Sequence, residues 1–216
     1  MPGHFLRSIH DALMWRLQKQ GRLRVAWVRV NRFRPSQEAS QSKNPEIAVR
    51  LLDRQAVLAL STDPASGLNA SDTRQRLGQG QFFIASLADE VLVGYDWYSP
   101  TALCLEEDAV YFVFDPSLIC CAYSFVHPAY RGRGLGGDRW DFAHRVFAAR
   151  GWRGTVYYIE TRNLSSLRAA AKRGDDAKLW VGMFAYVRLM GRYVCWTSRG
   201  CRGLGIAVTT RVPSTL

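Results

Sequence analysis

The first apolar positions of this chain recur at helical spacing. Phe5, Ile9, Leu13 and Leu17 stand four residues apart, and the same stretch carries Arg7, Arg16 and Lys19. This pattern predicts a basic amphipathic helix over residues 4–20. Such a helix can dock on a membrane surface or a partner, or it can pack on its own domain. The second role is favoured because helices of globular proteins have the same pattern.

The rest of the chain alternates between strand-like and helical runs. Strands are expected at 23–30, 46–52, 81–87, 91–98, 109–114, 118–126, 155–160, 179–187 and 192–196. Helices are expected at 53–60, 71–77, 138–150 and 164–173. Turn residues predict two hairpins, one over 81–98 and one over 109–126. Trp180 and Trp196 are expected in the sheet core. The run from 118 to 160 predicts a strand–helix–strand crossover with parallel strands, and therefore a mixed α/β fold.

Four glycines, Gly132, Gly134, Gly136 and Gly137, lie between the strand at 118–126 and the following helix. Glycine lets the backbone approach a ligand closely, and a helix start directs its amide N–H groups to one point. Arg131 and Arg133 add positive charge. The segment therefore predicts a phosphate or pyrophosphate site.

Two common phosphate-binding motifs fit this segment poorly. A P-loop ends in Gly-Lys-Ser/Thr, whereas this segment ends in Leu135-Gly136-Gly137-Asp138. A dinucleotide-binding motif belongs to an early strand–helix–strand unit with an acidic residue about twenty positions on.

A third pattern fits the segment and its surroundings. Arg131, Gly134 and Gly136 form Arg-x-x-Gly-x-Gly, preceded by Val126-x-Pro128. The segment resembles the acyl-CoA pyrophosphate loop of the GNAT superfamily of N-acetyltransferases, Val-x-Pro-x-Tyr-Arg-Gly-x-Gly-x-Gly. The resemblance covers about residues 46–196, with diagnostic spacing in 119–174.

The resemblance implies a GNAT fold: a mostly antiparallel, twisted sheet flanked by helices and splayed between two central parallel strands. The GNAT domain would span 46–198, with a basic N-terminal extension at 1–45 and a tail at 199–216. The implied activity is transfer of an acetyl or other acyl group from coenzyme A to an amine. The residues implied in acyl-CoA binding are Phe125, Val126, Arg131, Gly132, Arg133, Gly134, Leu135, Gly136, Gly137 and Asn163.

The usual acid and base of the superfamily do not carry over. Ala170 stands at the position of a Tyr general acid seven residues after Asn163, and Tyr158 stands where ribosomal-protein-modifying members have a Glu. Because strand side chains alternate, Tyr158 and Glu160 share one face. We therefore predict Glu160 as base and Tyr158 as acid, with Tyr123 as the alternate acid. Glu160 could instead be solvated, or paired with Arg162 or Arg168.

Charge bears on the choice of partners. The net charge is +11, but residues 51–130 carry −7. The basic half of the chain suits a polyanionic cofactor. The acidic middle suits a cationic acceptor, which would be a small-molecule or protein amine. The basic N-terminus leaves open a longer-acyl transferase that uses acyl-CoA or acyl carrier protein. A nucleic-acid-binding protein is a further alternative, disfavoured because the positive charge is split between the two ends and no recognition motif accompanies it.

The five cysteines are odd in number and lack zinc-ligand spacing, so we expect no metal and a reducing, cytoplasmic setting. Cys120 and Cys121 lie on the strand at 118–126, where a nucleophilic role competes with the favoured role of small buried side chains.

Overall fold

The computed structural model describes residues 23–33, 44–106, 109–172 and 178–213. The predicted helix over 4–20 lies outside these residues. Within the described part of the chain, no helix is both long and apolar enough to cross a membrane.

The described helices and strands follow one another as β1 (Leu23–Arg32), β2 (Ile47–Leu52), α2 (Arg54–Thr62), η1 (Pro64–Ser66), α3 (Ala70–Gly78), β3 (Phe82–Ala88), β4 (Val91–Ser99), β5 (Leu103–Glu106), β6 (Val110–Val113), β7 (Leu118–Val126), η2 (Pro128–Tyr130), α4 (Leu135–Ala149), β8 (Gly154–Glu160), α5 (Leu164–Lys172), β9 (Lys178–Leu189), β10 (Arg192–Thr197), α6 (Arg199–Arg202) and β11 (Ala207–Thr209). Asp53 caps α2, where its side chain accepts a hydrogen bond from the Ala56 amide at 2.8 Å.

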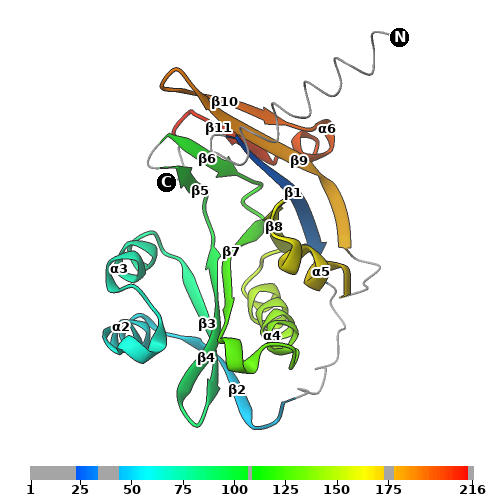
Figure 1. Ribbon diagram of the computed structural model, residues 1–216. Helices are drawn as coiled ribbons and strands as arrows, with labels where there is room; N and C mark the ends of the chain where they lie inside the picture. The colour runs from blue at the N-terminus through cyan, green and yellow to red at the C-terminus, as the bar shows by residue number, and fades with distance from the viewer. Residues whose placement is uncertain (1–22, 34–43, 107–108, 173–177, 214–216) are drawn as a thin grey trace.

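Eight strands form one sheet in the order β10-β9-β1-β8-β7-β4-β3-β2, and β11-β6-β5 form a second, smaller sheet (Figure 1). The β7–α4–β8 crossover makes β7 and β8 parallel neighbours, whereas the other described pairs are antiparallel. The mixed α/β fold, with a mostly antiparallel sheet around one parallel pair, is confirmed.

Helices cover both faces of the large sheet. α2 and α3 lie on one face of β3 and β4, and α4 lies on the other (Figure 1). Val57 of α2 packs with Phe83 and Trp97, while Phe147 of α4 packs with Ile84 on the opposite side. The small sheet covers the inner face of β1, β8 and β9. The parallel pair of β7 and β8 therefore has α4 on one face and the small sheet on the other.

β1 lies inside the sheet, although the sequence assigns its residues to the N-terminal extension. It pairs antiparallel with β8 on one side, with Ala26 opposite Glu160, and with β9 on the other, with Leu23 opposite Val187. These two ladders join β1 to strands more than a hundred residues away. The boundary at residue 45 therefore separates segments that share one sheet.

The predicted hairpin over 109–126 is wrong. β6 pairs with β5 and β11, whereas β7 pairs with β4 and β8 in the other sheet. The predicted turn is present, since the Leu118 amide donates to the Asp115 carbonyl at 2.9 Å. It leads the chain from β6 of the small sheet into β7 of the large one.

The predicted burial of two tryptophans is also wrong. The side chains of Trp180 and Trp196 are 41% and 55% exposed. In β10 the residues that pack against the core are Tyr193 and Cys195, so Trp196 lies on the opposite face. In β9 a bulge between Trp180 and Gly182, opposite Arg29 and Val28, turns Trp180 away from the face that carries Phe184 and Tyr186.

Candidate functional site

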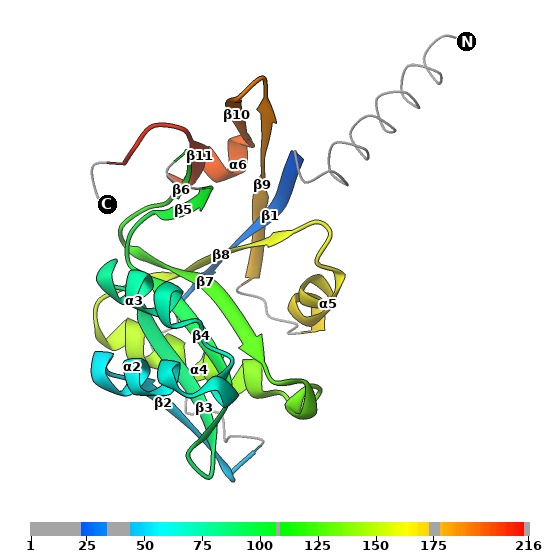
Figure 2. The same cartoon turned by 60° about the vertical axis from the view of Figure 1, so that its left-hand side comes forward.

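β7 and β8 are paired over only part of their length. Their ladder runs from Leu118 opposite Gly154 to Cys120 opposite Val156. Beyond that point both strands continue and diverge (Figure 2). An irregularity in the β4–β7 ladder follows at once, because Cys121 pairs with Tyr98 and Tyr123 with Trp97, so that Ala122 is an extra residue. Such a bulge bends its strand. A gap thus opens between residues 121–126 and 157–160.

The register of β7 shows which of its backbone groups face this gap. The His127 amide donates to the Val93 carbonyl at 2.9 Å. Opposed residues of an antiparallel ladder alternate between hydrogen-bonded and non-bonded pairs. Val126, opposite Gly94, is therefore a non-bonded position, and its N–H and C=O point away from β4 toward the gap.

A buried ion pair between α4 and β4 contacts the same stretch of β7. Arg139 of α4 is fully buried, and its Nη2 lies 3.0 Å from Asp96 Oδ1. The same nitrogen donates to the Phe125 carbonyl at 3.1 Å, and Ser124 Oγ donates to Asp96 Oδ1 at 2.6 Å. A Cβ at Gly94 would come within 2.5 Å of Arg139 Nη1, so this position must lack a side chain.

The glycine segment lies beyond the end of β7 and starts α4. The helix begins at Leu135, three residues earlier than the sequence predicts. Its N-cap, Gly134, has φ +86°, Gly132 has φ +82°, and no side chain caps the helix. This left-handed conformation suits glycine because it has no Cβ. The uncapped start leaves the first helical amides without intrahelical acceptors.

Several donors converge at this helix start. The amides of Gly132, Arg133 and Gly134 donate to no acceptor among the described residues. Arg131 and Arg133 are exposed, and Arg131 Nε donates to the Val126 carbonyl at 3.2 Å. Asn44, which precedes β2, contacts the glycine segment, because its Nδ2 donates to the Arg133 carbonyl at 3.0 Å. Uncapped amides, the helix dipole and two cations favour a phosphate group here.

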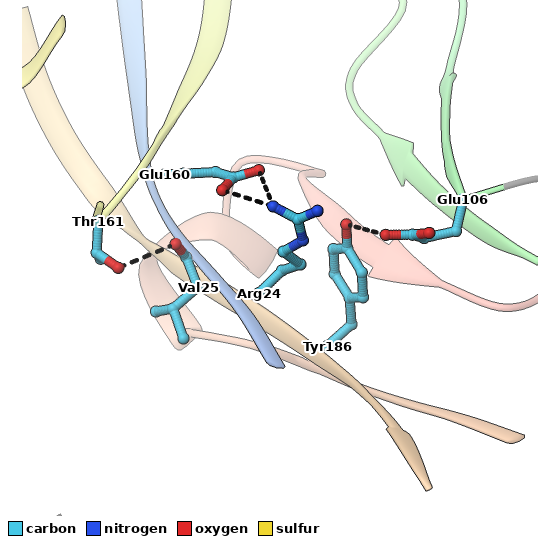
Figure 3. A network of polar contacts seen from close by, with 6 residues as sticks. All are labelled: Arg24, Val25, Glu106, Glu160, Thr161 and Tyr186. Carbon is cyan, nitrogen blue, oxygen red and sulfur yellow. Dashed lines mark hydrogen bonds and ion pairs between the residues drawn. The ribbon is translucent and has the colours of Figure 1, made fainter. Parts of the chain in front are cut away.

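A second feature is a polar cavity of about 90 Å³ on the sheet face that the small sheet covers. It is lined by Arg24, Ala26, Leu105, Glu106, Tyr158, Glu160, Phe184 and Tyr186. Figure 3 shows four of its polar residues, Arg24, Glu106, Glu160 and Tyr186. Arg24 Nη1 donates to both oxygens of Glu160, at 3.1 and 3.3 Å, and the Tyr186 hydroxyl donates to Glu106 Oε1 at 3.0 Å.

Both predicted members of the β8 acid–base pair line this cavity. Tyr158 packs edge-on against Phe112 and Phe184, and burial raises the pKa of its phenol well above the usual range. It therefore holds its proton at neutral pH. Glu160 is about one-third exposed and pairs with Arg24 of β1, whereas the sequence offered Arg162 or Arg168 as partners.

The other predicted site residues lie elsewhere. Tyr123 does not line the cavity; it is 46% exposed and stacks on Tyr95 with ring centroids 5.9 Å apart. Asn163 caps α5, since its Oδ1 accepts from the Ser166 amide at 3.1 Å. Cys120 is fully buried, which raises its thiol pKa and suits the structural role.

Sequence reasoning missed Arg24, Glu106 and Tyr186. They come from β1, β5 and β9, which are far apart in the chain. Burial, followed by the charge and hydrogen bond of Glu106, raises the pKa of Tyr186 well above its usual range. No local motif surrounds any of the three, so only strand pairing brings them together. No group of three or more His, Cys, Asp or Glu residues able to hold a metal is found among the described residues.

Comparisons with known proteins bear on the fold. No protein-family model and no curated protein matches the chain significantly. A functionally unknown conserved protein from Staphylococcus epidermidis is similar in structure, with a TM-score of 0.50 and 12% identity over 80% of this chain. A putative GNAT-family acetyltransferase from Novosphingobium aromaticivorans has a TM-score of 0.49 and 16% identity over 76% of this chain. The chain spans 64% and 63% of those two proteins. The aminoglycoside acetyltransferase AAC(6')-Iy, in complex with a CoA bisubstrate analogue, aligns over 61% of this chain and 92% of its own, with a TM-score of 0.44 and 16% identity.

Proposed function

We propose that this chain is an acyl-CoA-dependent N-acyltransferase of the GNAT superfamily, which moves an acetyl group from coenzyme A to a primary amine. The main support is one spatial relationship. The gap between β7 and β8 opens beside the uncapped, glycine-rich start of α4. The proposed phosphate-binding site is therefore adjacent to the unpaired edge of β7.

The loop from Arg131 to Gly137 would bind the pyrophosphate of acyl-CoA. The amides of Gly132, Arg133 and Gly134, and those of Leu135 and Gly136 at the start of α4, would donate to the phosphate oxygens. The side chains of Arg131 and Arg133 would remain at the rim, where they add positive charge. Asn163 would contribute from the first turn of α5, on the other side of the gap.

The edge of β7 would hold the pantetheine arm. Val126 directs its backbone toward the gap, and an amide-containing chain can pair with it as a further strand would. The carbonyl of Phe125 is held by Arg139 at 3.1 Å, which fixes the edge in place. An amide N–H of this edge would also stabilise the oxyanion that forms at the thioester carbonyl.

The amine would enter from the cavity side. A neutral amine attacks the thioester carbonyl carbon, so that a C–N bond forms and the C–S bond breaks. Glu160 would accept the amine proton, directly or through water, and Tyr158 would donate a proton to the departing thiolate. Tyr123 stays the alternate acid. Two carboxylates and one guanidinium around the cavity favour a cationic amine before it is deprotonated.

A thermal-shift series tests this function. We expect CoA and acetyl-CoA to raise the melting temperature, because ligand bound to the folded state stabilises it. A larger shift with longer acyl-CoAs would favour a longer-acyl transferase. Dephospho-CoA and pantetheine separate the loop's contribution from that of the strand edge. No shift with any of these compounds would contradict the proposal.

A further inference from the structure

Strands β1, β9 and β10 carry apolar side chains on both faces. Phe184 and Tyr186 of β9 point into the core with Ala26 of β1. Because strand side chains alternate, their sequence neighbours form the opposite face. We call this the apolar outer face: Trp27, Met183, Ala185, Val187, Val194 and Trp196. Register joins them, since Trp27 is opposite Met183, Ala185 opposite Trp196, and Val187 opposite Val194.

Half of this face is open to solvent, whereas Met183, Ala185 and Val187 are partly buried. Val194 and Trp196 are each 55% exposed, and Trp27 is 38% exposed. An antiparallel sheet that faces water normally alternates apolar with polar residues, and contiguous apolar patches are rare on monomers. The apolar outer face therefore has the composition of a surface that something covers.

We propose that residues 4–20 of the same chain dock on the apolar outer face. This segment precedes β1 directly, and β1 begins at Leu23, which is paired with Val187 at one end of the face. The residues between 20 and 23 can span at most about 11 Å. β1 therefore places the C-terminal end of this segment next to the apolar outer face.

The dimensions and pattern of the segment match the face. A helix of 17 residues, as the sequence predicts, is about 25 Å long. β9 continues this side beyond Val187 to Leu189, whose side chain is 48% exposed, and the stretch from Met183 to Leu189 is about 20 Å long. The stripe of Phe5, Ile9, Leu13 and Leu17 gives one apolar side to this helix. A covalent tether also favours this occupant over a free partner, because it makes docking intramolecular.

A double-mutant cycle in the full chain tests the docking. Val194→Lys should lower the melting temperature by roughly 5 °C, because it places a charge under the docked stripe. Val91→Lys, at another exposed valine (61%), serves as control and should have little effect. In a chain that carries Leu13→Lys, which disrupts the stripe, Val194→Lys should cost no more than Val91→Lys. Gln18→Lys adds the same charge on the predicted polar side and should leave the cost of Val194→Lys unchanged.

Oxidative footprinting of Trp196 gives a second, residue-specific readout. In the full chain Trp196 should be protected, and Leu13→Lys should expose it whereas Gln18→Lys should not. If Trp196 is protected only in a dimer seen by light scattering, irrespective of Leu13, a second copy covers the face and the proposal is wrong. If protection appears only when vesicles of anionic phospholipid are added, a membrane covers it. Additive effects of Leu13→Lys and Val194→Lys would likewise contradict docking.

Discussion

Arg139 Nη2 lies 3.0 Å from Asp96 Oδ1, and both side chains are almost completely screened from solvent. The pair joins α4, which starts at the phosphate-binding loop, to β4, which pairs with the gap-facing strand β7. Arg139 also bonds the Phe125 carbonyl. One buried guanidinium thus links the three elements on which cofactor binding is proposed to depend.

Arg139→Met should lower the free energy of unfolding by about 3–5 kcal/mol, because it leaves the carboxylate of Asp96 buried without a counter-charge. Urea denaturation measures this loss. Arg50→Met is a matched control, since Arg50 pairs with Glu90 at 2.9 Å on the surface. It should cost about 1 kcal/mol or less. Equal losses in the two variants would contradict a structural role for the buried pair.

Gly134→Glu should abolish acyl-CoA binding in calorimetry. The carboxylate would occupy the place proposed for the pyrophosphate and repel its charge. Because Gly134 has φ +86°, the substitution also strains the backbone. Gly191→Glu controls for this strain, since Gly191 has φ +80° in the β9–β10 turn and open space around it. The control should bind acyl-CoA normally; similar affinities in both variants would remove the loop from the proposed site.

The fold could be predicted from the sequence where its signals are local. The glycine segment, the helix after it and the parallel crossover were all recognisable, because each depends on residues close together in the chain. The insertion of β1 between β8 and β9 was not, since alternation marks a strand but not its partner. β6 was predicted as a strand but given the wrong partner for the same reason, whereas β5 was not predicted as a strand.

The candidate site divides in the same way. Tyr158 and Glu160 were predicted together because they are two residues apart on one strand. Arg24, Glu106 and Tyr186 reach the cavity only through long-range pairing. The exposure of Trp196 also escaped prediction, because aromatic residues at strand positions are buried in most sheets, and β10 is an edge strand of this one.

Stability should fall as pH rises from about 10 to 12. Burial, followed by the neighbouring Tyr123, raises the pKa of Tyr95 from 10.0 to about 12. Between these values the unfolded chain releases the proton while the folded chain retains it, so that stability decreases by at most about 1.4 kcal/mol per pH unit for this group. Below pH 10 its contribution is constant.

Tyr95→Phe should therefore reduce this dependence while preserving the ring stacked 5.1 Å from Phe83. Denaturation at pH 9, 10 and 11 measures the slope. Because burial also raises the pKa of Tyr158 and Tyr186, the slope should become smaller without vanishing. An unchanged slope would mean that the Tyr95 phenol ionises equally in the folded and unfolded chains.

Glu160→Gln should lower turnover by about a hundred-fold, the low end for a positioned general base, without weakening acyl-CoA binding. The amide keeps the shape of the carboxylate and cannot take the amine proton. The loss should diminish as pH rises, because more of the acceptor is then the free amine. Acyl transfer measured between pH 6.5 and 9.5, with calorimetry for the cofactor, provides both readouts.

Arg24→Gln separates this role from that of a structural ion pair. If Glu160 merely pairs with Arg24, at 3.1 Å on the partly exposed rim of the cavity, each substitution breaks the same contact. The two variants should then show the same small loss of stability and near-normal turnover. If Glu160 is the base, Arg24→Gln retains the proton acceptor and should keep far more activity than Glu160→Gln. Equal turnover in the two variants would therefore exclude Glu160 as base and leave a base-free attack by the small neutral fraction of the amine.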